Sequence, residues 1–191
     1  MLPKGSKRVA YISNALDWSR DFERRKRGEQ SDLEQLESLG IGLELEKIDL
    51  REYFNKEDEL KAAIAEFSAM WVCGGNAFVL RQAMKLSGFD SILQELFANG
   101  ADMLYGGYSA GICVLGPTLR GVHIMDPPSE KPYGDYATVW EGLNILDYVI
   151  VPHFESDHPE SEAVVKAVAY LIKHKIPFRT LRDGEVIIID D

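Results

Sequence analysis

The strongest chemical pattern in the sequence is GYSAG at residues 107–111, which places Ser109 at the centre of a G-x-S-x-G motif. A serine becomes an exposed nucleophile where a strand turns sharply into a helix, and small residues two positions before and after it permit that turn. An apolar stretch at 101–105 precedes the motif, and another at 112–115 follows it. The alternative is a tight strand-to-helix turn with a capping serine. The flanking elements favour Ser109 as a nucleophile.

A serine nucleophile needs a general base, and the sequence contains four histidines. His174 lies between lysines at the end of a predicted helix, where positive charge complements the helix dipole. His158 stands at the start of that helix, and His123 lies in an irregular loop and stays an alternative. His153 directly follows the predicted strand 148–151, so it lies at the same carboxyl edge of a parallel sheet as the serine. We therefore predict that His153 is the base.

A glycine turn, Gly74-Gly75-Asn76, ends one predicted strand and opens a helix. Backbone N–H groups at such a helix start can stabilise a developing oxyanion. The N–H of Ala110, directly after the serine, is the expected second donor. The alternative is a simple turn in which Asn76 caps the helix. The spacing is not G-x-G-x-x-G, so no dinucleotide site is predicted.

The loop after His153 is rich in residues that could bind a metal. They are Glu155, Asp157, His158 and Glu160. Their spacing matches neither H-E-x-x-H nor a cysteine–histidine zinc finger, and acidic residues are common at helix starts. We therefore expect no metal and no cofactor. Cys113, four residues after the serine, is expected to pack rather than to react.

The composition excludes several classes of protein. The 191 residues carry 31 acidic and 21 basic side chains, and the formal charge of −10 argues against nucleic-acid binding. No apolar run approaches the roughly 18 residues of a membrane span, and no segment resembles a signal peptide. Two cysteines are too few for a disulfide framework and suit a reducing cytoplasm. Without repeats or linkers, residues 1–191 are predicted to form one domain.

Short apolar strands alternate with helical patterns, which predicts a three-layer α/β fold with a mainly parallel sheet. Strands are expected at 8–13, 43–50, 69–73, 101–105 and 148–151. A helix is expected to restart after Gly28 at a capping box formed by Ser31 and Glu34. Segments 179–181 and 185–189 bracket Asp183-Gly184, which predicts a hairpin.

Three segments in this order, strand–GGN–helix, strand–GGYSAG–helix and strand–VPHF, resemble the peptidase E (aspartyl dipeptidase) family, to which cyanophycinases are related. The resemblance covers nearly the whole chain from Arg8 onward. It implies a cytoplasmic serine peptidase that cleaves short peptides without a cofactor. The implied fold is a flavodoxin-like or class I glutamine-amidotransferase-like α/β sheet. By this similarity Ser109 is the nucleophile, His153 the base, and Gly75 and Ala110 supply the oxyanion donors.

The resemblance offers two candidates for the acidic residue that orients the base. A late L-x-[Glu/Asp]-G turn of the family matches LRDG at 181–184 and gives Asp183. An I-x-Asp-Pro-like segment lies after the strand-to-helix turn at Ser109, which we call the elbow; it matches IMDP at 124–127 and gives Asp126. We prefer Asp183, because a hairpin holds a side chain more rigidly than a proline-rich loop does. Asp126 is kept as a second candidate and as part of the substrate site.

The sequence departs from the family at two points. Family members begin with a further strand and helix before the segment matched by 8–13; their absence would leave a sheet edge open to pairing in a homodimer. Members specific for aspartyl peptides carry an arginine after PHF, where this chain has only Lys166. We therefore expect poor cleavage of aspartyl peptides, unless Arg120 or Arg182 points into the cleft.

Together these observations predict a dipeptidase-like serine peptidase that forms an acyl-enzyme on Ser109, with a small peptide as its partner and neither nucleic acid nor membrane. One alternative is a serine esterase of the α/β-hydrolase type. That class usually has a longer chain and an HGGG-type donor loop. The other alternative is a non-catalytic homologue that binds a small ligand.

Overall fold

A computed structural model describes residues 7–189 of the chain. The first half contains β1 (Arg8–Ile12), η1 (Asn14–Trp18), α1 (Phe22–Ser38), β2 (Glu44–Lys47), η2 (Leu50–Tyr53), α2 (Glu57–Ile64), β3 (Ala69–Val72) and α3 (Ala77–Ser87). The second half contains α4 (Phe89–Ala98), β4 (Leu104–Gly107), α5 (Ala110–Cys113), η3 (Val122–Ile124), β5 (Val149–Val151), α6 (Ser161–His174) and β6 (Phe178–Thr180).

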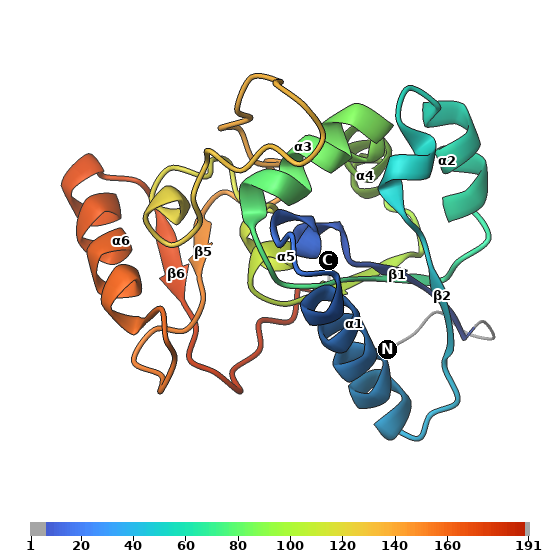
Figure 1. The fold of residues 1–191 in the computed structure, drawn as a ribbon, viewed down its shortest axis with the longest axis horizontal. Coiled ribbons are helices and arrows are strands. Elements are labelled where there is room, and N and C mark those ends of the chain that lie inside the picture. Colours follow the sequence, from blue (N-terminus) through green and yellow to red (C-terminus); the bar gives the residue numbers. More distant parts are fainter. Residues whose placement is uncertain (1–6, 190–191) are drawn as a thin grey trace.

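The central sheet has four parallel strands in the order β2-β1-β3-β4. Helix α1 covers one face, and α2, α3 and α4 cover the other (Figure 1). The predicted three-layer, mainly parallel α/β fold is therefore confirmed. The inner strands are apolar because helices cover both of their faces. In β1 and β3, Tyr11, Ile12, Met70 and Val72 are all almost fully buried.

A second sheet pairs β5 with β6 in parallel, with Val149 opposite Phe178. Helix α6 connects these two strands and lies beside them (Figure 1). The predicted hairpin is wrong, because within the described residues no strand follows β6. Residues Asp183-Gly184 do form a turn, in which the Glu185 N–H donates to Arg182 O. The turn signal was therefore correct, but β6 finds its partner across a helical crossover instead of in the next segment.

The predicted restart of the first helix at Ser31 is also wrong. Helix α1 runs without a break from Phe22 to Ser38, and its N-cap is Asp21, whose side chain accepts the Arg24 N–H. Ser31 lies within the helix and accepts a hydrogen bond from the side chain of Gln35. The capping pattern of Ser31 and Glu34 therefore does not start a new helix, because a continuous α1 buries Leu36 against the core.

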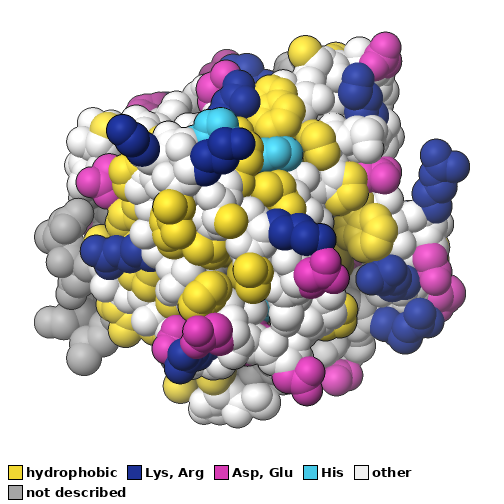
Figure 2. Space-filling model, turned by 90° about the vertical axis from the view of Figure 1, so that its left-hand side faces the viewer, with side chains coloured by type: hydrophobic (Ala, Val, Ile, Leu, Met, Phe, Trp, Pro, Cys, Tyr) yellow, Lys and Arg dark blue, Asp and Glu magenta, His cyan; other side chains and the backbone are white. Residues whose placement is uncertain are grey.

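Both cysteines lie in the core as free thiols. Burial raises the pKa of the Cys113 thiol well above its usual value, which keeps it protonated and supports the prediction that it packs. In the described part of the chain, no helix combines the length and apolar character that crossing a bilayer needs. Figure 2 shows hydrophobic side chains on the face towards α6, where Val165 and Ile172 are exposed.

Candidate active site

The motif around Ser109 forms a strained turn between β4 and α5. Ser109 has φ 47° and ψ −116°, which is rare for a residue with a side chain. A Cβ atom on Gly107 would lie 2.5 Å from the carbonyl oxygen of Val72, and one on Gly111 would lie 2.1 Å from it. Both glycines of the motif are therefore required, because the turn presses directly against the end of β3. The neighbouring strand ends at Gly107, later than the predicted 101–105.

The structure brings Ser109, His153 and Asp183 together from three separate segments. Nε2 of His153 lies 3.4 Å from Oγ of Ser109. On the other side of the ring, Nδ1 lies 2.7 Å from Oδ1 of Asp183. His153 follows β5 and has φ 61°, again in the left-handed region. The serine, the imidazole and the carboxylate thus form one continuous chain of contacts.

The pairing of β5 with β6 continues beyond both strands and positions Asp183. The Leu181 N–H donates to Val151 O, and the Phe154 N–H donates to Leu181 O, both at 2.9 Å. The N–H of Asp183 donates to Oγ of Ser156 at 2.8 Å. The loop after His153 and the turn that carries Asp183 are therefore fastened to each other. Ser156 was not singled out from the sequence, since a lone serine in a polar loop carries no distinguishing signal.

Asp126 occupies a different place, at the start of α3. Its Oδ2 accepts the Ala77 N–H at 2.8 Å. Burial raises the pKa of Asp126 to about 7, the Ala77 hydrogen bond partly opposes this, and the charge of Glu160 adds to it. The side chain of the neighbouring Asn76 donates to Pro127 O. Asp126 therefore borders the glycine turn, whereas Asp183 contacts the ring of His153.

The glycine turn lies directly against the serine. A Cβ on Gly74 would lie 3.0 Å from Cβ of Ser109, and one on Gly75 would lie 2.3 Å from Ala15 O. The side chain of Asn76 caps α3 by accepting the N–H groups of Phe78 and Val79, which is the capping role that the sequence offered as the alternative. Within residues 7–189, the N–H groups of Gly75 and Ala110 have no hydrogen-bond acceptor. Both groups are thus available to a ligand.

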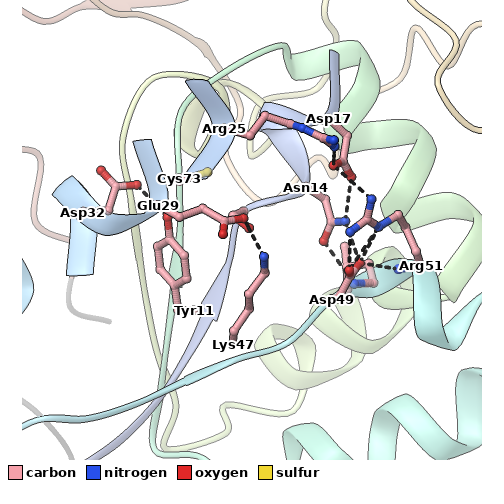
Figure 3. A network of polar contacts seen from close by, with 12 residues as sticks. Tyr11, Asn14, Asp17, Arg25, Glu29, Asp32, Lys47, Asp49, Arg51 and Cys73 are labelled. Atoms are coloured by element: carbon pink, nitrogen blue, oxygen red, sulfur yellow. Dashed lines mark hydrogen bonds and ion pairs between the residues drawn. The ribbon is translucent and has the colours of Figure 1, made fainter. Parts of the chain in front are cut away.

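A polar network that the sequence reasoning missed surrounds Asn14, next to Ala15, against which Gly75 packs (Figure 3). The amide of Asn14 donates to Asp17 and to Asp49 at 3.0 Å each. Burial opposes ionisation of Asp49, but hydrogen bonds from Arg51 and Asn14 outweigh it and lower its pKa to about 2. This network fixes Asn14 and so the adjoining Ala15. The carboxylates, amide and arginine come from distant segments, so only the fold reveals their contact.

A second link ties the elbow to α1. The hydroxyl of Tyr108 donates to Asp32 at 2.8 Å, and Tyr11 donates to the same carboxylate. A hollow of about 670 Å³ opens on this side, between α1, Trp71 and Tyr108. Neither Ser109 nor His153 lines it. Ser109 and His153 therefore lie outside this hollow.

The geometry of the two neighbouring imidazoles does not suit a metal ion. Ligand atoms of His153, His158 and Glu160 lie within 4.8 Å of one another. The two rings are stacked, however, with centroids 3.8 Å apart and planes only 6° apart. The nitrogen lone pairs lie in the planes of their rings, and two nearly parallel planes do not meet near the rings, so the lone pairs do not converge on one ion. Nδ1 of His158 already accepts the Glu160 N–H.

Comparison with known proteins decides the family. The model of peptidase family S51 matches residues 1–191. This chain belongs to peptidase family S51. Membership places it among the serine peptidases, which are hydrolases, and confirms the resemblance to peptidase E.

Curated relatives of the S51 chain are about 28–31% identical to it over the aligned residues. It is 28% identical to an uncharacterised peptidase of Listeria innocua, over 82% of this chain and 69% of the relative. It is 31% identical to an uncharacterised peptidase of Listeria monocytogenes, over 70% of this chain and 60% of the relative. It is 28% identical to peptidase E of Streptomyces coelicolor, over 96% and 68%. The chain thus spans about two thirds of the length of these relatives.

A crystal structure of a candidate peptidase E protein from Listeria monocytogenes has the same fold. The TM-score is 0.72 at 26% identity, and the match covers 95% of the S51 chain and 82% of the other.

Proposed function

We propose that this chain hydrolyses small peptides through an acyl-enzyme on Ser109, in the manner of a dipeptidase. The observation that carries the proposal is the chain of contacts from Ser109 through His153 to Asp183, at 3.4 and 2.7 Å. Triads are recognised by this geometry and not by order in the sequence. The longer contact is typical of a site without substrate, where catalytic hydrogen bonds tighten on binding.

Each residue then has a defined task. Nδ1–H of His153 donates to Asp183, which leaves Nε2 free to accept the proton of Ser109 Oγ as the oxygen attacks the peptide carbonyl. The N–H groups of Gly75 and Ala110 stabilise the oxyanion of the tetrahedral intermediate. Its collapse breaks the C–N bond, and His153 returns the proton to the leaving amine. Water, activated by His153, then hydrolyses the ester and frees Ser109.

Asp126 is proposed to bind the free amino group of the substrate. It borders the glycine turn, and burial raises its pKa to about 7, so among the described residues this carboxylate has no cation that stabilises its charge. A nearby cation would favour the ionised form. An ammonium group beside this carboxylate supplies such a cation. This contact would restrict cleavage to the first bond of a short peptide.

The cations near the loop after His153 already have other partners. Arg182 pairs with Glu155, and Lys166 pairs with Glu162. Arg120 lies over the ring of Trp140, 5.2 Å from its centroid. We therefore propose that the first residue of the substrate is neutral or basic. The two buried free thiols suit a reducing cytoplasm as the place of action.

A fluorophosphonate probe tests the proposal, because it reacts only with an activated serine. Intact mass should show one adduct, which peptide mapping assigns to Ser109. The variants Ser109→Ala and His153→Ala should take up no probe, and Ser38→Ala, on the far end of α1, should react like the unmodified chain. Labelling that persists in Ser109→Ala contradicts the assignment. A chain that neither reacts nor cleaves dipeptides would be a non-catalytic homologue, and one that cleaves only esters would be an esterase.

A further inference from the structure

The ring of His158 lies flat on the ring of His153. Their centroids are 3.8 Å apart and their planes differ by 6°. His158 lies five residues after His153, so the intervening loop folds back on itself to bring the rings together. From the sequence, His158 was interpreted as a neighbour of a helix start and was considered as a metal ligand.

The structure fixes His158 independently of His153. Its Nδ1 accepts the Glu160 N–H at 3.2 Å, which places the remaining ring proton on Nε2. Its backbone N–H donates to Oγ of Ser161, the first residue of α6, and its carbonyl accepts the Ser161 N–H. Helix α6 in turn buries Val164 and Leu171 in the core. His158 is therefore attached to a firmly packed element.

His153 needs a support of this kind. Its two ring contacts, to Asp183 and Ser109, are made by the two ring nitrogens, Nδ1 and Nε2. Two contacts do not prevent the ring from tilting about the line that joins them. A flat group pressed against one face does prevent it, and the tilt decides whether the Nε2 lone pair points at the serine hydroxyl.

We propose that His158 is a positioning residue, which holds the plane of the His153 ring so that Nε2 faces Ser109. This inference rests on the proposed function. It predicts that removing the ring of His158 slows proton transfer without weakening substrate binding. A displacement of the order of 1 Å in a catalytic group costs about 100-fold in rate.

Three substitutions separate the ring from the hydrogen bond. His158→Ala removes both. His158→Asn keeps an acceptor near the position of Nδ1 but removes the ring, and His158→Phe keeps a flat ring but removes the acceptor. His174→Ala is the matched control, because the His174 ring contacts Tyr170 at the opposite end of α6, with centroids 4.1 Å and planes 31° apart.

The measurements are kcat and KM for a cleaved dipeptide, and the rate of fluorophosphonate labelling at Ser109. His158→Ala and His158→Asn should each lose about 10- to 100-fold in kcat and labelling rate, with KM unchanged. His158→Phe should recover most of the loss, and His174→Ala should match the unmodified chain. Thermal unfolding of every variant shows whether it is folded.

The outcomes distinguish this inference from the proposed function. If the unmodified chain is labelled and His158→Ala reacts at the same rate, the positioning role is wrong and the triad stands. If His158→Asn keeps the activity and His158→Phe loses it, the hydrogen bond from the Glu160 N–H is what matters, and the stacking role is wrong. If the unmodified chain is unreactive, both proposals fail together. Should His158→Ala not fold, the comparison of Asn with Phe decides alone.

Discussion

The carboxylate of Asp183 lies 2.7 Å from Nδ1 of His153, although about half of the Asp183 side chain is exposed to solvent. An exposed carboxylate on a turn would ordinarily be mobile, and its ion pair would contribute little. Here the Asp183 N–H is held by Ser156, and Leu181 is held by the end of β5. The contact therefore depends on the backbone of the β5–β6 pair and on the loop fastened to it.

Asp183→Asn should lower kcat far more than Asp126→Asn. Only the carboxylate on Nδ1 fixes the ring tautomer and stabilises the imidazolium, and such a loss costs about 10⁴-fold. Asp126→Asn should instead raise KM, by about tenfold, because it weakens a charged contact of about 1.4 kcal/mol to the substrate amine. Steady-state kinetics on one dipeptide measures both effects. Equal losses of kcat in the two variants would contradict the division of roles.

Gly111→Ala should destabilise the fold severely. Its Cβ would lie 2.1 Å from Val72 O, a backbone atom of β3 that cannot move aside. The cost should exceed about 3 kcal/mol in the free energy of unfolding. Gly28→Ala is the matched control in α1, where the new Cβ meets Leu16 at an ordinary 3.4 Å. It should stabilise the helix by about 0.5–1 kcal/mol.

Urea unfolding of the two glycine variants measures these changes. A Gly111→Ala protein as stable as the unmodified chain would show that the elbow is not pressed against β3.

Asp126 should make the fold less stable as the pH rises from about 4 to 7. Its folded pKa of about 7 exceeds the ordinary 3.8, so in this window the unfolded chain is ionised while the folded chain keeps the proton. Ionisation then favours unfolding, by at most about 4 kcal/mol once the pH is above 7. Below about pH 4 both states are protonated and the penalty vanishes.

Asp126→Asn should remove this penalty, so its stability advantage should grow between pH 4 and 7 and then level off. Denaturant melts of the two proteins across that range measure the difference. A difference that is independent of pH would contradict a raised pKa for Asp126.

Peptides that begin with aspartate should be poor substrates. Recognition of the aspartate side chain of such a substrate requires a free cation, preferably an arginine. Arg182 is already paired with Glu155. Of the acidic side chains at 155–162, Glu155 and Glu162 are paired with Arg182 and Lys166. The other two, Asp157 and Glu160, make no ion pair within residues 7–189 and keep the local potential negative. A panel of dipeptides that differ only in the first residue gives the profile of kcat/KM. A preference for Asp-Xaa over Ala-Xaa and Lys-Xaa would overturn this reading of the loop.

Local patterns in the sequence determined the elements that carry the chemistry. The G-x-S-x-G motif, the glycine turn and the PHF segment each follow a short apolar stretch. Strands β3 and β4 bring the glycine turn and Ser109 to one edge of the central sheet, as parallel strands must. His153 was expected at the same edge, but β5 belongs to the second sheet, so His153 reaches Ser109 from outside the central sheet. Asp183 was preferred to Asp126 because a hairpin was expected to hold it, and the described residues contain no such hairpin.

Only the tertiary structure decided how the side chains meet. Asp183 reaches His153 because β6 pairs with β5 across α6, a contact between segments far apart in sequence. The stacking of His158 on His153 and the network around Asn14 likewise depend on loops folding back, which no periodicity encodes. Periodic patterns report which face of an element is buried, whereas the angle and distance between two polar groups follow from the packing of whole elements.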